Sequence, residues 1–188
     1  MQIKSAIFIK GITSDDANLH NGKPQVAIIG RSNAGKSTLI NTLCENGNLA
    51  KSSKSPGRTR EINLFLINDT HYFVDLPGYG YAKTSIDMAH KINDLINWYL
   101  FNSEQSYKAV VLIDSFVGPT EDDLKIIGDL EKTDKEVIIV LNKIDKVKKS
   151  HQFGRIKELT EQFPVHKVIA CSSKEKTGIS ELRDEILG

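Results

Sequence analysis

The sequence predicts an α/β fold, a doubly wound and mostly parallel sheet with one antiparallel hairpin strand at an edge. Short runs rich in valine and isoleucine alternate with helix-length amphipathic stretches along the 188 residues, which is typical of strand–helix units that build a parallel sheet covered on both faces. A glycine-rich segment also lies directly between a predicted strand and a predicted helix. The length fits one domain. We therefore expect a single domain over 1–188 with a short N-terminal strand extension over 1–24.

The apolar runs predict seven strands, over 5–10, 25–29, 61–67, 71–75, 108–113, 136–141 and 167–170. The amphipathic stretches predict five helices, over 36–44, 86–101, 120–131, 148–163 and 179–187. We expect Thr120 to cap one helix and Ser180 to lie near the cap of another. Residues 68–70 (NDT) indicate a tight turn, which predicts the antiparallel hairpin. The other connections are long enough for right-handed crossovers.

Composition excludes several classes of protein. Twenty-five Lys and Arg against twenty-four Asp and Glu give a formal net charge of +1, so the whole chain has no strong general attraction to nucleic acid or membrane. The apolar runs are far shorter than the roughly 20 residues of a membrane span, and the first residues lack the apolar core of a signal peptide. We expect a cytoplasmic, monomeric protein without a membrane partner. Cys44 and Cys171 have neither metal-binding nor redox spacing, so we interpret both as buried small hydrophobes.

The strongest motif is GRSNAGKS at residues 30–37, which matches a phosphate-binding P-loop between a strand and a helix. Its glycines let backbone N–H groups surround phosphate oxygens, and the helix N-terminus adds a favourable dipole. Lys36 is expected to reach the β and γ phosphates, and the Ser37 hydroxyl to bind Mg²⁺. The residues expected to bind the phosphates are Gly30, Arg31, Ser32, Asn33, Ala34, Gly35, Lys36, Ser37 and Thr38.

A second motif, NKID at residues 142–145, follows an apolar strand and indicates specificity for guanine. The Asp145 carboxylate can accept from both guanine N1–H and the exocyclic amino group, an arrangement that adenine does not offer. We expect Asn142 to hold the base edge and the adjacent loop, and the Lys143 stem to lie along the base. After the last strand, Ser172 and Ser173 form a loop in which the Ser173 N–H could meet guanine O6. GTP and GDP are therefore the expected ligands.

Two further segments are expected to respond to the γ-phosphate. Asp75 ends a strand at the carboxyl edge of the sheet, where it would hold Mg²⁺ through water, and Gly78 would present its N–H to the γ-phosphate. Thr59 is the only threonine between the P-loop helix and the hairpin, and with Gly57 it lies in a polar loop just before a strand. We expect Thr59 to bind Mg²⁺ as a second switch. Lys36, Thr59 and Gly78 are the candidate catalytic residues.

The order of these motifs is similar to that of the TrmE-Era-EngA-EngB-Septin-like class of P-loop GTPases. More narrowly, the chain resembles the EngB family of ribosome-biogenesis GTP-binding proteins, also called YihA or YsxC. The resemblance lies in GRSNAGKSTLIN (30–41), SPGRTR (55–60) and DLPGYGYAK (75–83). It implies a single G domain that hydrolyses GTP with Mg²⁺ and acts in assembly of the large ribosomal subunit, with ribosomal RNA and proteins as partners.

Two positions bear on the hydrolysis rate. Many GTPases position the attacking water with a glutamine directly after Asp-x-x-Gly, and this chain has Tyr79 there. A phenol cannot orient water as an amide does, so we predict slow intrinsic hydrolysis that a partner or an ion completes. Asn33 resembles the asparagine that binds K⁺ in related potassium-stimulated GTPases, which makes K⁺ a candidate cofactor. The alternative is that Asn33 only caps the loop.

Basic residues cluster in two places near these motifs: Lys51, Lys54, Arg58 and Arg60 in one, and Lys146, Lys148 and Lys149 in the other. They could contact RNA phosphates, although lysine clusters are also common on solvated surfaces. Two other functions remain open. One is a regulatory GTPase with a protein effector and no ribosomal role. The other is a P-loop kinase, which would have no use for Asp145.

Overall fold

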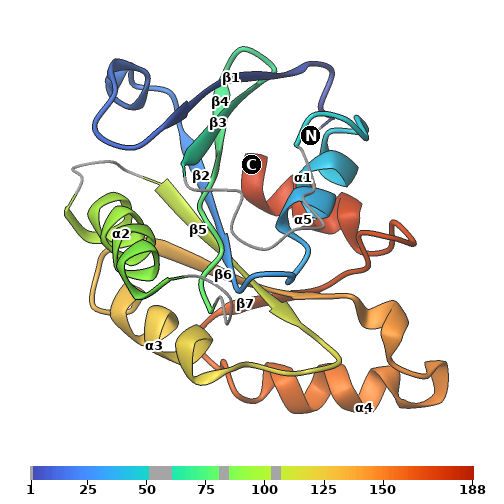
Figure 1. Ribbon diagram of the computed structural model, residues 1–188. Coiled ribbons are helices and arrows are strands. Elements are labelled where there is room, and N and C mark those ends of the chain that lie inside the picture. The colour runs from blue at the N-terminus through green and yellow to red at the C-terminus, as the bar shows by residue number, and fades with distance from the viewer. Residues whose placement is uncertain (1, 51–60, 81–84, 103–106) are drawn as a thin grey trace.

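The computed structural model describes residues 2–50, 61–80, 85–102 and 107–188 (Figure 1). They form a seven-stranded sheet in the order β1-β3-β4-β2-β5-β6-β7. In chain order the strands are β1 (Ala6–Ile12), β2 (Gln25–Gly30), β3 (Ile62–Ile67), β4 (His71–Asp75), β5 (Tyr107–Asp114), β6 (Glu136–Asn142) and β7 (Lys167–Ala170). The predicted α/β fold with a mostly parallel sheet is therefore confirmed.

The predicted hairpin is present and consists of β3 and β4. These strands pair antiparallel, and the turn between them contains Asn68 and Asp69, both with positive φ (50° and 58°), as a two-residue hairpin turn requires. β1 pairs antiparallel with β3 on its other side. The N-terminal extension thus supplies the edge strand, β1. The hairpin was expected at the edge, but it lies one strand further into the sheet.

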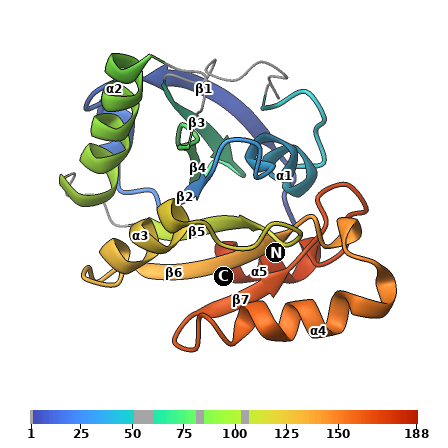
Figure 2. The same ribbon diagram turned by 60° about the horizontal axis from the view of Figure 1, so that its bottom comes forward.

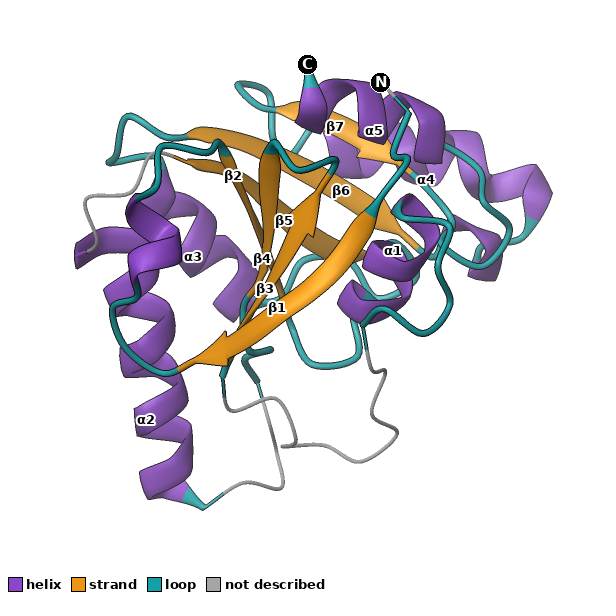
Figure 3. Cartoon of the chain, turned by 90° about the horizontal axis from the view of Figure 1, so that it is seen from above, coloured by secondary structure: helices purple, strands orange, loops and turns teal. Residues whose placement is uncertain are grey.

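Helices cover both faces of the sheet. The helices α1 (Lys36–Leu43) and α5 (Ile179–Leu187) share one apolar core, and the helices α2 (Ile86–Asn97), α3 (Glu121–Leu130) and α4 (Lys149–Thr160) share the other. Figure 3 shows the sheet between α1 and α5 on one side and α2 and α3 on the other, while α4 lies beside β7 (Figure 2). Successive side chains of β2 alternate between the two cores, because side chains of a strand point to opposite faces.

Three short helical turns complete the elements: a 3₁₀ turn at Ala17–His20, a π-helical turn at Trp98–Asn102 that continues α2, and a 3₁₀ turn at Ile144–Lys146. The predicted helix over 86–101 therefore changes its hydrogen bonding at Trp98. Among the described residues, every helix is too short or too polar to span a bilayer.

The expectations for the two helix starts are both met. Thr120 caps α3 as predicted, with a reciprocal capping box between its side chain and Asp123. Ser180 lies near the cap of α5, as predicted: it is an exposed residue of the first turn, and the N-cap itself is Gly178 with φ of 71°. A Cβ at position 178 would lie 2.2 Å from the Ala170 carbonyl oxygen, so close packing against the end of β7 requires glycine there.

Candidate nucleotide-binding site

The P-loop turns between β2 and α1 with two residues in the left-handed region, Asn33 (φ 69°) and Gly35 (φ 103°). Backbone conformations of this kind let successive N–H groups surround an anion. Gly35 is the N-cap of α1, and no side chain caps it, so the first-turn N–H groups are open to a phosphate. A Cβ at Gly35 would lie 2.5 Å from Asn142 Nδ2. Glycine is thus needed both for the turn and for the close approach of residues 142–145, the loop predicted to bind guanine and called the guanine loop below.

Lys36 and Asp75 are brought together beneath the P-loop. Lys36 Nζ donates to the Gly30 carbonyl at 3.0 Å, and Asp75 lies at the end of β4 in register with Ile28 of β2. Burial lowers the pKa of Lys36 and raises the pKa of Asp75 to about 6, and in each case the opposite charge of the other group counteracts the shift.

Asp75 has the properties of a magnesium ligand. It is only 3% exposed, and its Oδ1 atom has no hydrogen-bond partner among the described residues. An orphaned buried carboxylate oxygen is costly, and carboxylate, hydroxyl and water oxygens are the ligands that Mg²⁺ prefers. Ser37, at the start of α1, is half-buried. A bound Mg²⁺ would neutralise charge on the phosphates. Thr59, the other predicted ligand, and Gly57 lie outside the described residues.

Gly78 packs directly onto the P-loop. A Cβ at this position would lie 2.9 Å from Lys36 Nζ and 3.1 Å from the backbone nitrogen of Ser32. The chain next to Gly78 is bonded to β2 and to the P-loop: Leu76 N–H donates to the Ile28 carbonyl at 3.1 Å, and Ser32 N–H donates to the Tyr79 carbonyl at 2.8 Å. The two predicted catalytic residues that the structure describes, Lys36 and Gly78, are therefore neighbours.

Asn142 connects the guanine loop to the P-loop and to the last predicted loop. It is the final residue of β6 and is 1% exposed. Its Nδ2 donates to the Ala34 carbonyl at 2.9 Å, and its Oδ1 accepts from Ser173 Oγ at 2.9 Å. Asn142 thus fixes the relative positions of three segments.

Ser173 differs from expectation. Its backbone N–H, expected to meet guanine O6, donates to Asn142 Oδ1 at 3.2 Å. The physical reason is that the buried amide oxygen of Asn142 needs donors, and Ser173 supplies two of them. The Ser173 carbonyl is also fixed, since it accepts from Thr42 Oγ1 at 2.8 Å.

Lys143 and Asp145 lie on either side of Ile144 in the guanine loop. Lys143 has a φ of 63°; its Nζ donates to the Asn33 carbonyl and forms an ion pair with Asp114 Oδ2 at 2.7 Å. Asp145 Oδ1 accepts from Ser172 Oγ at 2.6 Å, and no residue in the described part of the chain donates to its Oδ2. This half-buried carboxylate is thus oriented by Ser172 and keeps acceptor capacity for a base edge.

Asp114 is a site residue that the sequence reasoning missed. Burial alone would raise its pKa, but the hydrogen bond and positive charge of Lys143 hold the pKa of Asp114 below its ordinary value. The available signal was positional: Asp114 ends β5 and pairs with Asn142 at the carboxyl edge of the sheet, where ligands bind in open α/β folds.

Tyr79, at the position of the water-orienting glutamine, points into the protein. It is 4% exposed, and its hydroxyl donates to Asp123 Oδ1 at 2.5 Å. Burial and the charge of Asp123 raise its pKa far above the ordinary tyrosine value, so the phenol is a neutral donor. Asp123 was also missed, although its capping-box spacing from Thr120 is visible in the sequence.

The remaining predicted features have mixed outcomes. Cys44 and Cys171 are buried and free, as expected, and burial raises the pKa of each thiol to about 12. Lys146, Lys148 and Lys149 are exposed; the other basic cluster, in 51–60, lies outside the described residues. The described chain contains no group of three or more His, Cys, Asp or Glu side chains that could hold a metal.

The phosphate-binding turn, the orphaned Asp75 oxygen and the open Asp145 carboxylate together define a P-loop protein of the guanine-nucleotide-binding class. Comparison with known proteins agrees: residues 25–143 match the model of a family described as 50S ribosome-binding GTPase. The chain belongs to the EngB family of GTP-binding proteins and has their GTPase fold and activity.

Relatives and solved structures support this membership. Probable GTP-binding proteins EngB from Thermoanaerobacter pseudethanolicus and Caldanaerobacter subterraneus subsp. tengcongensis are 40% and 42% identical to the chain, over 97% of its length and 96% and 95% of theirs. A crystal structure of a probable GTP-binding protein EngB superposes with a TM-score of 0.71 at 27% identity, covering 87% of this chain and 96% of that one. Era in complex with MgGDPNP and part of 16S ribosomal RNA matches with a TM-score of 0.69 at 26% identity, covering 88% and 56%.

Proposed function

We propose that this chain is a single G domain that acts as a GTP-operated switch in assembly of the large ribosomal subunit, as a cytoplasmic monomer. The contact of Gly78 with Lys36 carries the switch part of this proposal, because a γ-phosphate bound by the lysine would meet the backbone of the segment that must respond to it. The description of the matching family as 50S ribosome-binding supports the choice of partner.

In this proposal the nucleotide is held by residues 30–38, by Asn142, Lys143 and Asp145, and by the loop that contains Ser172 and Ser173. Mg²⁺ is held by Ser37, Asp75 and Thr59. Asn33 is the proposed K⁺ ligand, and equal GTPase rates in potassium and sodium buffers would contradict that assignment.

Co-sedimentation tests the partner. Purified protein is centrifuged with large ribosomal subunits and their precursors in a non-hydrolysable GTP analogue, in GDP and without nucleotide. We expect pelleting with the GTP analogue and little with GDP, because only a γ-phosphate engages Gly78. Equal pelleting in all three conditions would contradict gating by nucleotide. Absence of pelleting throughout would favour the alternative, a GTPase with a protein effector.

The exposed lysines beside the guanine loop suggest how the ribosome is contacted. Ribosomal RNA is a polyanion, and each phosphate contact contributes roughly 0.7–0.9 to the slope of log affinity against log salt. Lys148 and Lys149 lie at the start of α4, next to the proposed nucleotide site. Neither is among the residues proposed to bind the nucleotide.

We therefore expect the double variant Lys148→Ala/Lys149→Ala to bind subunits about tenfold more weakly, with a shallower salt dependence and unchanged GTP affinity. The matched control is Lys132→Ala/Lys167→Ala, which removes the same charge from exposed positions after α3 and at the start of β7. Equal effects of the two double variants would mean that only net charge matters. Subunit binding that survives high salt would indicate that the contact is not made with RNA phosphates.

A further inference from the structure

Tyr79 forms hydrogen bonds through its backbone to the P-loop and through its side chain to α3. Its backbone carbonyl accepts from the Ser32 N–H of the P-loop at 2.8 Å, and its hydroxyl donates to Asp123 Oδ1 of α3 at 2.5 Å. A parallel β-bridge between Arg31 and Tyr79 adds to the first attachment. The residue therefore joins the P-loop to α3 through both its backbone and its side chain.

The acceptor, Asp123, is strongly constrained. Its Oδ2 accepts from the backbone N–H and the Oγ1 of Thr120, each at 2.7 Å. Asp123 is also only 3% exposed. Tyr79 is the donor to the other oxygen. If Tyr79 withdrew, a buried carboxylate oxygen would lose this donor, which is costly. The phenol is thus firmly held.

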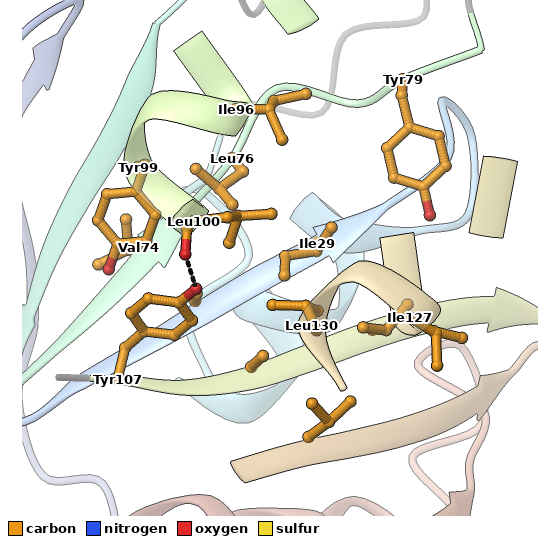
Figure 4. Close-up of a cluster of buried hydrophobic side chains, with 14 of the residues drawn as sticks. Ile29, Val74, Leu76, Tyr79, Ile96, Tyr99, Leu100, Tyr107, Ile127 and Leu130 are labelled. Atoms are coloured by element: carbon orange, nitrogen blue, oxygen red, sulfur yellow. Dashed lines mark hydrogen bonds between the residues drawn. The ribbon is translucent and has the colours of Figure 1, made fainter. Parts of the chain in front are cut away.

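The ring of Tyr79 is also packed in the core formed with α2 and α3. Figure 4 shows Tyr79 with its hydroxyl directed into the protein, in a cluster that includes Ile29 of the P-loop strand, Ile96 of α2 and Ile127 of α3. Packing and hydrogen bonding therefore favour the same orientation of the side chain.

These attachments bracket Gly78. On one side of it, Leu76 N–H is bonded to Ile28 of β2; on the other side, Tyr79 is bonded to both the P-loop and α3. Leu76 and Tyr79 therefore hold the chain before and after Gly78. The position of the Gly78 backbone against Lys36 depends on how firmly Tyr79 is anchored. Tyr79 directly follows Gly78, so its side chain is the nearest one on that side that could anchor the glycine.

We propose that Tyr79 is a positioning residue: its hydroxyl bond to Asp123 holds Gly78 at the γ-phosphate site and thereby sets the ratio of the affinities for GTP and GDP. The side chain acts through Gly78 and does not orient the attacking water. This role rests on the proposed contact of Gly78 with the γ-phosphate and does not depend on the ribosomal proposal.

The test compares Tyr79→Phe with Tyr107→Phe. Both replace a buried tyrosine of the same core and remove one hydroxyl, but the Tyr107 hydroxyl donates to the Leu100 carbonyl at 2.6 Å and has no link to the P-loop. Affinities for GDP and for a non-hydrolysable GTP analogue are measured by fluorescence titration, and GTP hydrolysis under single-turnover conditions.

For Tyr79→Phe we expect GTP-analogue affinity to fall about tenfold, GDP affinity to change less than twofold, and the hydrolysis rate to fall. Tyr107→Phe should lower the melting temperature and leave the ratio of the two affinities unchanged. An unchanged ratio in Tyr79→Phe, or the same shift in both variants, would overturn the proposal.

A variant of the acceptor covers the case in which Tyr79→Phe is poorly folded, and a double-mutant cycle then measures the coupling. Asp123→Asn keeps the shape of the side chain but removes its charge and turns one of its two acceptor oxygens into a donor, which weakens the network that accepts the Tyr79 hydroxyl. If the proposal is right, Asp123→Asn alone lowers the GTP-to-GDP affinity ratio, and adding Tyr79→Phe changes the ratio by less than the sum of the single effects. An Asp123→Asn protein with the wild-type ratio would contradict the proposal.

Discussion

At the scale of single residues, Asp75 is placed for function at a cost to stability. Its pKa is about 6 in the folded protein, against an ordinary value of 3.8, because burial penalises the charged form. A group whose pKa is raised by folding destabilises the fold as it ionises. The cost is therefore absent near pH 4, grows between about pH 4 and 6, and stays constant above that range.

Replacing this carboxylate by an amide, Asp75→Asn, should consequently stabilise the metal-free and nucleotide-free protein above pH 6, by about 1–3 kcal/mol. Loss of the attraction to Lys36 offsets part of the gain. Calorimetric melting in a chelator across pH 4.5 to 8 measures the effect. The difference from wild type should shrink toward pH 4.5, and a variant that is less stable than wild type at pH 8 would contradict this explanation.

In the proposed site, Asp145 determines the base. Changing it to asparagine replaces one acceptor oxygen by a donor, while Ser172 Oγ can still bond to the remaining oxygen. Xanthine carries a carbonyl where guanine has its amino group, so Asp145→Asn should weaken GDP binding at least a hundredfold and favour xanthosine diphosphate. Competition between the two nucleotides for the purified variant measures this shift. Retained preference for guanine would place the base elsewhere.

At the scale of the elements, helix α3 is well capped and α2 is not. The Thr120 side chain accepts from Asp123 N–H, whereas Ser85, the N-cap of α2, makes no side-chain capping bond. We expect Thr120→Ala to cost about 1 kcal/mol, or roughly 2–4 °C in melting temperature. Ser85→Ala, the matched control, should lie within measurement error. Equal losses in the two variants would show that the capping box is not the source of the stability.

Sequence patterns predict a helix or strand well where interactions between residues close in the sequence determine it. The β3–β4 hairpin follows from the Asn68–Asp69 turn, and the P-loop helix begins at Lys36 as its motif requires. The edge position of β1 was not predictable in the same way, because its partner, β3, begins fifty residues after β1 ends. The cap of α5 depends on contact between Gly178 and the end of β7, which sequence spacing does not reveal.

At the scale of the whole molecule, the motifs predict which residues gather at a nucleotide, and the tertiary contacts show how those residues are held. The spacing of the motifs predicts the meeting of Lys36 and Gly78. It does not predict that Asn142 takes up the Ser173 N–H, or that Tyr79 bonds to Asp123, 44 positions further along the chain. Those bonds arise because buried polar atoms must be satisfied by whichever partners the fold brings near.

In the proposed function, the guanine nucleotide controls binding to the large ribosomal subunit. The most direct test uses Asp145→Asn in co-sedimentation with large subunits, beside wild-type protein, with non-hydrolysable analogues of GTP and of xanthosine triphosphate. We expect wild type to pellet with the GTP analogue alone and the variant with the xanthosine analogue alone, because changing the base specificity should change the control of binding with it. A variant that binds the xanthosine analogue yet stays in the supernatant, or that pellets equally with either analogue, would contradict the claim.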